Sequence, residues 1–382
     1  MRDGSAGSFP GDPSQKRRSW LMPPGRPFSE GGKRMEGMKE KKKTVRISLK
    51  DRICLAVRPH LVILFALAAL MVIMSLIAPN FLSKGNMMDI IRVNSIKGIM
   101  SIAMTLVLLT GGIDLSVGST FAVAGAVTAS LTIGGYSDYI TSNLFKCNTY
   151  AAILIGLSVA ALIGLANGLI VTKLKVEPFI ATLAMMIFAR GITYLYTGGY
   201  PINFKPIPAD FAWFGKGYLG IVPAPAVLFI LVALAGGWLL RYTSFGRSLF
   251  AIGGNRETAR LSGIRTERNV CLTYVLMGVM AGLAGIIMTS RVASASAVAG
   301  ESYEMDVIAG VVLGGTLQSG GKGSVAGTVI GIFIFGVIEN GLNILGLPTY
   351  YKLFIKGLVI ILAVGGRYLF PNRETSRKIG GV

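Results

Sequence analysis

Apolar segments that are long enough to cross a lipid bilayer recur along the chain and alternate with polar segments. A membrane-spanning helix needs roughly 20 apolar residues, and shorter apolar segments interrupted by Gly lie between the long ones. We therefore expect about ten membrane-spanning helices and an all-α polytopic membrane protein. The long segments are residues 61–78, 151–172, 179–197, 223–240, 269–289, 325–345 and 352–367, and the shorter ones are residues 96–109, 119–133 and 305–317.

Basic residues assign a side of the membrane to the segments between these helices. With ten spans, both termini, residues 173–175, residues 241–268 and the turn at Lys322 fall on one face, which is basic throughout. If one of the short spans did not cross the membrane, half of these charges would move to the opposite face. Because cytoplasmic loops carry an excess of Lys and Arg, we expect both termini in the cytoplasm and the loops 199–221 and 290–304 outside.

Composition supports a membrane protein and explains the charge without nucleic acid. Hydrophobic residues make up 52% of the 382 residues and charged residues 15%, with a mean hydropathy of +0.61, whereas soluble domains carry about 25% charged residues. The formal net charge of +20 is concentrated, because residues 1–60, 241–268 and 367–382 contribute +9, +4 and +3. Basic segments beside spans are typical of cytoplasmic loops.

The polar ends divide the chain into three parts. Residues 1–55 are rich in Gly, Pro, Ser and basic residues without apolar periodicity, so we expect a disordered cytoplasmic tail. Residues 56–370 form the transmembrane domain, and residues 371–382 form a second cytoplasmic tail. An alternative account of the first tail is that translation begins at Met35 or Met38.

The sequence contains no cluster typical of an enzyme, a metal site or a cofactor site. A Walker A phosphate loop is approached most closely at residues 320–324, but Thr316 stands where that motif needs Gly and Gly323 where it needs Ser or Thr. The three cysteines have no metal-ligand spacing. We therefore expect no catalytic residue and no cofactor, and ATP that drives this protein would be hydrolysed on another chain.

Glycines and polar residues interrupt the apolar sequence at residues 111–119. One interpretation is a cap, in which the polar side chains accept hydrogen bonds from the amides that open the next helix. The other is that the broken helix lines a translocation path, since ionisable groups at membrane depth point to function. These roles are compatible. The residues concerned are Gly111, Gly112, Asp114, Ser116, Gly118 and Ser119.

Two further segments have a pattern of their own. Residues 311–327 form a second Gly-rich break; paired breaks point to a binding site between repeats, although close helix packing also explains the glycines. In the loop 241–268, Asn255 is a good N-cap, Glu257 favours a first helical turn and Gly263 is a stop signal. A short helix defined in this way favours a docking site for a soluble partner over a helix on the membrane surface.

Four motifs together resemble the ribose-type permease subunits of bacterial ATP-binding-cassette sugar importers. The resemblance runs in order from about residue 61 to residue 364. It implies an inner-membrane permease that pairs with a second permease subunit, either identical or a close paralogue, and works with a cytoplasmic ATPase and an extracytoplasmic sugar-binding protein. The motifs are residues 112–119, 178–183, 253–263 and 303–327.

The same resemblance implies a role for the short cytoplasmic helix. Its residues correspond to the segment through which the ATPase of such importers acts on the spans. Where many importers carry Glu-Ala-Ala, this chain has Thr258 in the middle, and both residue types fit a small position. The residues expected to couple are Gly254, Asn255, Glu257, Ala259 and Gly263.

Three more charged residues are candidates for function. Arg190 lies midway along an apolar segment and needs a partner or water; an ion pair with Asp114 or Glu339 is favoured over contact with sugar hydroxyls. Glu304 and Asp306 flank the start of a short outer span, where they either cap the helix or receive basic residues of the binding protein.

These observations predict the import of a monosaccharide, ribose or a related sugar, through a lipid-embedded permease powered by a separate ATPase. The alternative is a stand-alone secondary transporter or channel for a small polar solute. In that case Asp114 and Arg190 would form a proton or ion relay.

Overall fold

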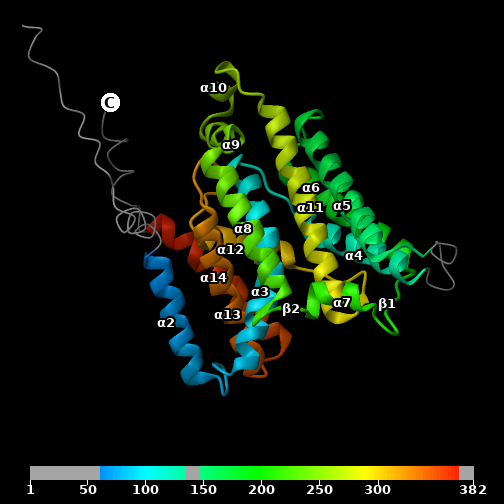
Figure 1. Cartoon of the computed structure of the whole chain (residues 1–382). Coiled ribbons are helices and arrows are strands. Elements are labelled where there is room, and N and C mark those ends of the chain that lie inside the picture. Colours follow the sequence, from blue (N-terminus) through cyan, green and yellow to red (C-terminus); the bar gives the residue numbers. More distant parts are fainter. Residues whose placement is uncertain (1–60, 135–145, 370–382) are drawn as a thin grey trace, which may run out of the picture. The chain divides into compact units, whose positions relative to one another are not determined.

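The computed structural model describes residues 61–134 and 146–369, which form a bundle of helices (Figure 1). The predicted tails at residues 1–55 and 371–382 lie outside the described residues. Each of the ten apolar segments contains a helix. These helices are α2 (Leu61–Ile77), α3 (Lys84–Leu109), α4 (Val117–Ile133), α5 (Thr149–Thr172), α6 (Pro178–Thr197), α8 (Ala224–Tyr242), α11 (Thr266–Val292), α12 (Tyr303–Leu313), α13 (Val325–Ile344) and α14 (Thr349–Leu369).

Shorter elements connect these helices. They are α7 (Ala209–Lys216), α9 (Ser244–Gly254) and α10 (Arg256–Leu261), together with the strands β1 (Ile202–Asn203), β2 (Tyr218–Leu219), β3 (Val222–Pro223) and β4 (Ser294–Ala295). The strands form two small antiparallel pairs, β1 with β4 and β2 with β3. They are a minor departure from the all-α fold that the sequence predicts.

Six of the helices are long and apolar enough to cross a membrane, namely α3, α5, α6, α8, α11 and α13. Helices α2 and α4 are apolar but have 17 residues each. Helix α12 has 11 residues, or about 16 Å at 1.5 Å per residue, which is short of a hydrocarbon core of about 30 Å. The chain is therefore polytopic, and the count of ten spans stays a prediction.

Helix α3 begins earlier than its apolar segment predicts. The Ser83 hydroxyl accepts a hydrogen bond from the Asn86 amide at 3.4 Å and caps the helix, which starts at Lys84. The first turns of α3 are polar, so the apolar pattern predicted a start near Ile96 instead. A Ser at the N-cap is the local feature that indicates the longer helix.

Helices α3 and α11 form the centre of the bundle. Helix α3 packs against α8, α11, α12 and α13, and α11 packs along α5 and α4. Two glycines let the α5 and α11 backbones approach closely: a Cβ added at Gly164 would lie 2.3 Å from the carbonyl oxygen of Tyr274, and one at Gly278 would lie 2.3 Å from that of Ala160. Small residues permit this kind of contact between membrane helices.

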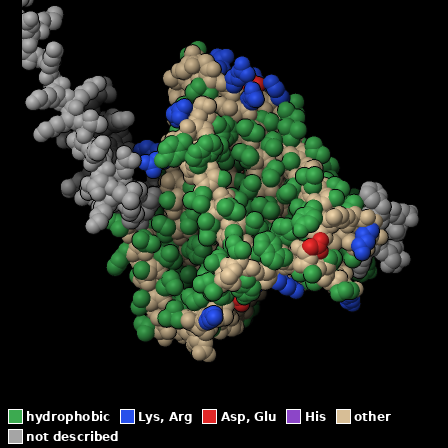
Figure 2. Space-filling view, viewed as in Figure 1, with side chains coloured by type: hydrophobic (Ala, Val, Ile, Leu, Met, Phe, Trp, Pro, Cys, Tyr) green, Lys and Arg blue, Asp and Glu red, His purple; other side chains and the backbone are tan. Residues whose placement is uncertain are grey.

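The three internal segments predicted to be cytoplasmic lie at one end of the bundle. Lys173 Nζ lies 2.9 Å from Glu267 Oε2, which joins the α5–α6 turn to the start of α11. Gly321, in the turn that contains Lys322, packs against Gly253 at the end of α9. Lys and Arg side chains gather over α9 and α10, whereas hydrophobic side chains cover much of the bundle below them (Figure 2). These segments therefore share one face, as the charge pattern predicts.

The two loops predicted to face outward meet at the opposite end. Strand β1 pairs with β4, with Ile202 opposite Ala295. Helix α7 is held to the end of α11, because the Ser290 hydroxyl donates to the carbonyl oxygen of Phe211 at 2.6 Å and accepts from the amide of Gly215 at 2.9 Å. Residues 199–221 and 290–304 are thus joined by strand pairing and hydrogen bonds.

Candidate functional site

The break between α3 and α4 is built on a left-handed glycine. Gly111 has a φ of +77°, a conformation that costs Gly little and other residues much more. The amides of Gly111 and Gly112 donate to the carbonyl oxygens of Leu108 and Val107 at 2.9 and 3.2 Å. These bonds close the last turn of α3 and release the chain from helical geometry.

Asp114 shapes the start of α4. Its side chain is buried, with 2% of the residue exposed, and Oδ1 accepts hydrogen bonds from the amide and the hydroxyl of Ser116 at 2.8 and 2.7 Å. Asn167 on α5 donates to the Ser116 hydroxyl at 2.8 Å. Asp114 forms no ion pair with a described residue, so hydrogen bonds alone compensate the burial of its carboxyl group.

The capping interpretation therefore holds for Asp114 and is wrong for the two serines. Ser116 is the N-cap residue of α4 but makes no side-chain capping bond, because its hydroxyl donates to Asp114. The Ser119 hydroxyl donates to the carbonyl oxygen of Met186 on α6 at 2.8 Å. Both serines fasten α4 to neighbouring groups rather than to its own first amides.

Neighbouring helices hold the break in place. The Tyr274 hydroxyl on α11 and the Thr182 hydroxyl on α6 donate to the carbonyl oxygen of Ile113 at 3.2 and 3.4 Å. On the next turn, Gly118 packs so closely on the outer loop that an added Cβ would lie 2.1 Å from the carbonyl oxygen of Gly300. The break is thus continuous with the 290–304 loop.

Arg190 binds this loop and does not form the ion pair that we expected. Its guanidinium donates to the carbonyl oxygen of Ala297 and, at 2.8 Å, to that of Ala299. The prediction was wrong because backbone carbonyls satisfy the guanidinium, while Asp114 is occupied by Ser116. Arg190 also lines a hollow of about 340 Å³ with Glu304 and neighbouring residues of the loop.

Glu339, the other expected partner of Arg190, belongs to a cluster of two lysines and two carboxylates, of which Lys97 and Asp306 are buried and Glu339 and Lys356 are partly exposed. Lys97 Nζ on α3 donates to Asp306 Oδ2 at 2.6 Å and also to Glu339. Lys356 Nζ on α14 lies 3.0 Å from Asp306 and 3.2 Å from Glu339. The ring of Tyr303 lies 4.9 Å from Lys97 Nζ. Four helices therefore meet at one neutral group of charges.

This cluster corrects the role predicted for Asp306. The residue is 3% exposed and its two oxygens are held by Lys97 and Lys356, so its carboxylate is not presented to a docking protein. Glu304 is half-buried and lines the hollow beside Arg190. The N-cap residue of α12 is Ser302, which makes no side-chain capping bond.

The two Gly-rich breaks touch, and α9 packs against both. The Gly321 amide donates to the carbonyl oxygen of Leu109 at 3.0 Å. A Cβ added at Gly253 would lie 1.9 Å from that same oxygen and 2.3 Å from the Gly321 amide nitrogen. We call Leu109–Gly111, Gly320–Gly321 and Gly253 the glycine junction.

The short helix predicted within residues 241–268 is confirmed as α10. The Asn255 side chain accepts a hydrogen bond from the Thr258 amide at 2.9 Å, and Gly263 has a φ of +81° just after the helix. Ala259 is buried. Glu257 is exposed and bonded to Arg260 at 2.6 Å, and this hydrogen bond lowers the pKa of its carboxyl group. Gly254 and Glu257 are both exposed, so this part of the chain presents an accessible surface around α10.

Comparison with known proteins identifies the family of this chain. Residues 86–364 match the family described as the branched-chain amino acid transport system / permease component. The chain belongs to this permease family. It is 45% identical over 303 residues to the ribose import permease protein RbsC of Escherichia coli (strain K12), which covers 79% of this chain and 91% of the relative.

Other relatives of the permease are similar over comparable lengths. The ribose import permease protein RbsC of Bacillus subtilis (strain 168) is 44% identical over 77% of this chain and 88% of its own length. The galactose/methyl galactoside import permease protein MglC of Escherichia coli (strain K12) is 36% identical over 79% of this chain and 91% of its own length. No solved structure matches the chain.

The permease is a multi-pass inner-membrane protein that transports rather than catalyses. It is a subunit of a binding-protein-dependent importer, a class that works with an ATPase and a binding protein. Within residues 61–134 and 146–369, no group of three His, Cys, Asp or Glu residues is placed to hold a metal ion. Sequence reasoning missed Lys97 and Lys356, although a Lys inside an apolar span was an available signal. It placed Gly253 in a motif but did not predict its contact with the two breaks.

Proposed function

We propose that this permease imports a monosaccharide, ribose or a related sugar, in an ATP-driven system. The observation that carries the proposal is the 45% identity over 303 residues to a protein named as a ribose import permease. The family description refers to branched-chain amino acids, but the relatives similar over most of both chains are named for ribose and galactose import. Similarity of this extent favours sugar over an amino acid.

The translocation path runs along the broken helix at residues 111–119. Ten spans cross the membrane, and both termini lie in the cytoplasm. The hollow beside Arg190 and Glu304, at the end formed by the outer loops, receives sugar released by the binding protein. Ser116, Ser119 and Gly118 fix the wall of the path, and Asp114 sets its geometry without carrying a proton.

The ATPase docks on the open surface of α10. Gly254, Asn255, Glu257, Ala259 and Gly263 form this coupling segment. Gly253, one residue earlier, contacts the ends of both broken segments through the glycine junction. A movement of α9 and α10 therefore reaches both breaks through backbone contacts alone. A second permease subunit, identical or closely related, completes the cavity.

Substitution of the coupling segment tests this arrangement. Glu257→Ala removes the carboxylate that the open surface presents to the ATPase, and Gly263→Val strains a left-handed position. Each variant is expected to insert and to lose most sugar uptake. Uptake equal to that of the unchanged protein, in both variants, would refute the coupling assignment.

A ligand screen on the binding protein that co-purifies with the permease identifies the substrate. The proposal predicts that ribose or a related sugar raises the melting temperature of that binding protein. Stabilisation by branched-chain amino acids, and by no sugar, would contradict it.

A further inference from the structure

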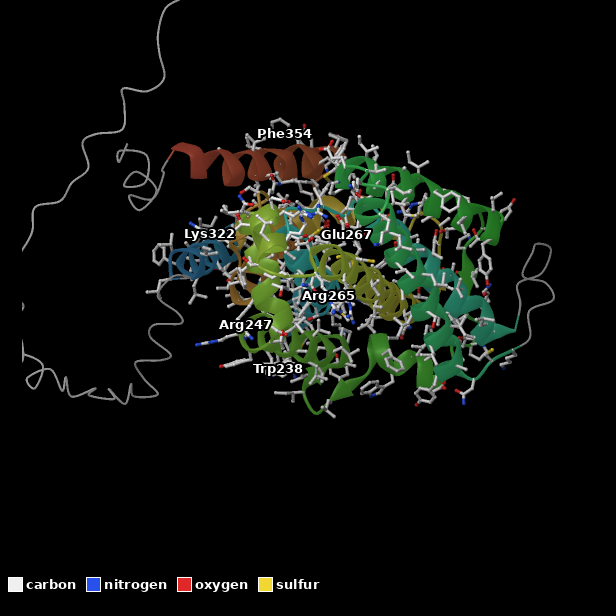
Figure 3. The ribbon with its side chains drawn as sticks, turned by 90° about the horizontal axis from the view of Figure 1, so that it is seen from above. Trp238, Arg247, Arg265, Glu267, Lys322 and Phe354 are labelled. Carbon is white, nitrogen blue, oxygen red and sulfur yellow. The ribbon has the colours of Figure 1, made fainter. Side chains whose placement is uncertain are left out.

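A hollow of about 620 Å³ lies between α5 and α11. Two of the residues that line it, Arg265 and Glu267, are labelled in the view from above the basic end of the bundle (Figure 3). Its floor is apolar and is lined by Leu165 and Leu169 of α5 and by Leu272 and Val275 of α11. Leu165, Leu169 and Leu272 are exposed on this floor. The described chain thus leaves an apolar groove open beside its basic surface.

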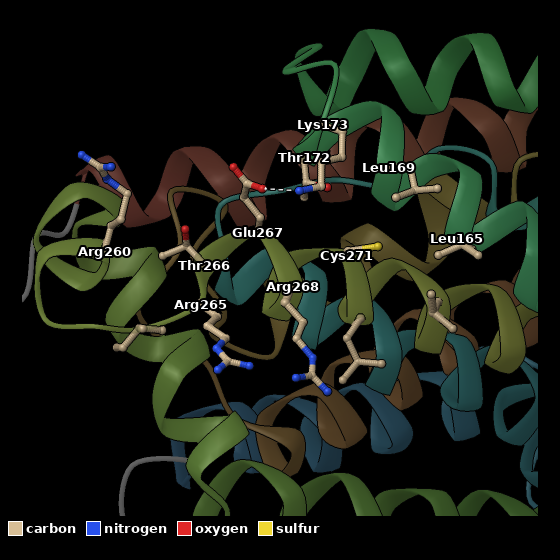
Figure 4. A pocket seen from close by; sticks show the side chains of 13 residues that line it. Leu165, Leu169, Thr172, Lys173, Arg260, Arg265, Thr266, Glu267, Arg268 and Cys271 are labelled. Atoms are coloured by element: carbon tan, nitrogen blue, oxygen red, sulfur yellow. Dashed lines mark hydrogen bonds and ion pairs between the residues drawn. The ribbon is translucent and has the colours of Figure 1, made fainter.

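Basic residues surround the groove, and two of them are already paired. Lys173 pairs with Glu267 at 2.9 Å and Arg260 with Glu257 at 2.6 Å. Arg265 and Arg268 also line the groove, and both guanidinium groups point to the same side, away from the Lys173–Glu267 pair (Figure 4). Neither side chain forms an ion pair or a hydrogen bond with any residue that the structure describes.

The position of these two arginines is electrostatically unfavourable for the isolated chain. Arg265 is the N-cap residue of α11 and Arg268 lies in its first turn. The N-terminus of a helix carries partial positive charge and favours acidic groups over basic ones. A bound anion would remove this repulsion.

The depth of the groove distinguishes a lipid from a soluble partner. Val275 lies about 13 Å along α11 from the first residue of that helix, and Leu165 lies about 10 Å from the last residue of α5, at 1.5 Å per residue. Both helices are long and apolar enough to span the membrane. A soluble protein does not reach between two spans at this depth, whereas an acyl chain does.

We infer that this groove binds an anionic phospholipid of the cytoplasmic leaflet. Arg265 and Arg268 hold the phosphate group, and one acyl chain covers the apolar floor. Basic pockets between membrane helices on the cytoplasmic side bind lipid head groups in this way. The inference uses the predicted cytoplasmic location of the basic end and is independent of which solute is transported.

The same two arginines border the coupling segment. They line a second hollow of about 380 Å³ with Ser244, Phe245 and Ser248 of α9. The head group would therefore lie beside the helix that carries Gly253. The ATPase is consequently the rival occupant of this surface, and the experiment must separate the two.

Native mass spectrometry of the purified full chain in detergent measures the binding directly. Phosphatidylglycerol and phosphatidylcholine with identical acyl chains are titrated separately. We expect tighter binding of phosphatidylglycerol, and Arg265→Gln/Arg268→Gln is expected to weaken it about fivefold for each arginine removed. Phosphatidylcholine binding should not change. Equal phosphatidylglycerol affinity of the double variant and the unchanged chain would overturn the inference.

Two further variants control for charge and fold. Arg265→Lys/Arg268→Lys retains both charges and is expected to keep most of the phosphatidylglycerol preference. Arg247→Gln removes an exposed arginine of α9 that lines neither hollow, and it should bind both lipids as the unchanged chain does. A loss of preference in Arg247→Gln equal to that in the double variant would show a general charge effect and overturn the site.

Competition distinguishes a lipid from other occupants. Inorganic phosphate and glycerophosphoglycerol carry the anion without acyl chains, so neither should displace bound phosphatidylglycerol at equal concentration. Displacement by either would identify a bare anion site. Added ATPase should leave the lipid bound, and its displacement of the lipid would identify a protein interface instead.

Discussion

The backbone amide of Gly321 donates a hydrogen bond to the carbonyl oxygen of Leu109 at 3.0 Å. Leu109 ends α3 directly before the first Gly-rich break, and Gly321 lies in the second break, far away in the sequence. Gly253 of α9 packs against both partners of the bond. Helix α9 and the two breaks therefore meet through backbone atoms, without any side chain between them.

Gly253→Ala is expected to reduce uptake at least about tenfold. The added Cβ would lie 1.9 Å from the carbonyl oxygen of Leu109, so α9 must move away from the breaks. Sugar uptake by reconstituted vesicles, normalised to inserted protein, measures the effect. Gly237→Ala is the matched control, because nothing lies within 4 Å of the added Cβ there. Full uptake by Gly253→Ala would show that the junction does not transmit movement.

Lys97→Met is expected to lower the free energy of unfolding by about 3 kcal/mol or more. Removal of one partner of a buried ion pair leaves charge uncompensated, and here Asp306 and Glu339 would share Lys356 alone. Reversible unfolding in detergent measures the change. Lys84→Met, at the exposed start of the same helix, should change it by less than about 0.5 kcal/mol.

The double variant Lys97→Met/Asp306→Asn separates charge from packing. It removes one positive and one negative charge, so it should recover part of the stability that Lys97→Met loses. If the two substitutions were strictly additive, the four charges would not act as a cluster.

The Asp114→Asn variant is expected to retain most sugar uptake, whereas the Asp114→Ala variant is expected to lose most of it. Asparagine keeps an oxygen that accepts from the Ser116 amide, while alanine removes this bond at a cost of about 1 kcal/mol. Uptake assays on both variants, with insertion checked, measure the difference. Complete loss of uptake in a normally inserted Asp114→Asn protein would indicate that the negative charge itself is needed.

Arg190→Met is expected to loosen the outer loop. The arginine supplies hydrogen bonds to the carbonyl oxygens of Ala297 and Ala299, each worth about 1 kcal/mol. Hydrogen exchange of residues 297–302 should become roughly tenfold faster or more. Arg241→Met, at the other end of the molecule, should leave it unchanged. Unaltered exchange in Arg190→Met would mean that the loop is held by its own backbone.

The local elements were predictable from the sequence because their causes are local. Apolar length located all ten helical segments, and clusters of Lys and Arg grouped the segments that share the basic end. The short helix α10 was predicted from Asn255, Glu257 and Gly263, since a capping side chain, an acidic first turn and a left-handed glycine each act within a few residues.

The partners of buried charges were not predictable in the same way. Lys97 and Glu339 are separated by 242 residues, and only the packing of α3 against α13 brings them together. For Arg190, we considered only charged partners and water or sugar hydroxyls, whereas the structure supplies two backbone carbonyls. Carbonyl groups are present at every residue, so no sequence pattern marks those that a guanidinium will bind.

Uptake by reconstituted vesicles tests the central claim most directly. The permease is inserted into liposomes with its ATPase and binding protein, and labelled ribose is followed with ATP inside and without an ion gradient. The account predicts uptake that requires ATP, the ATPase and the binding protein together. Ribose uptake by this chain alone, driven by an ion gradient and indifferent to ATP, would contradict it.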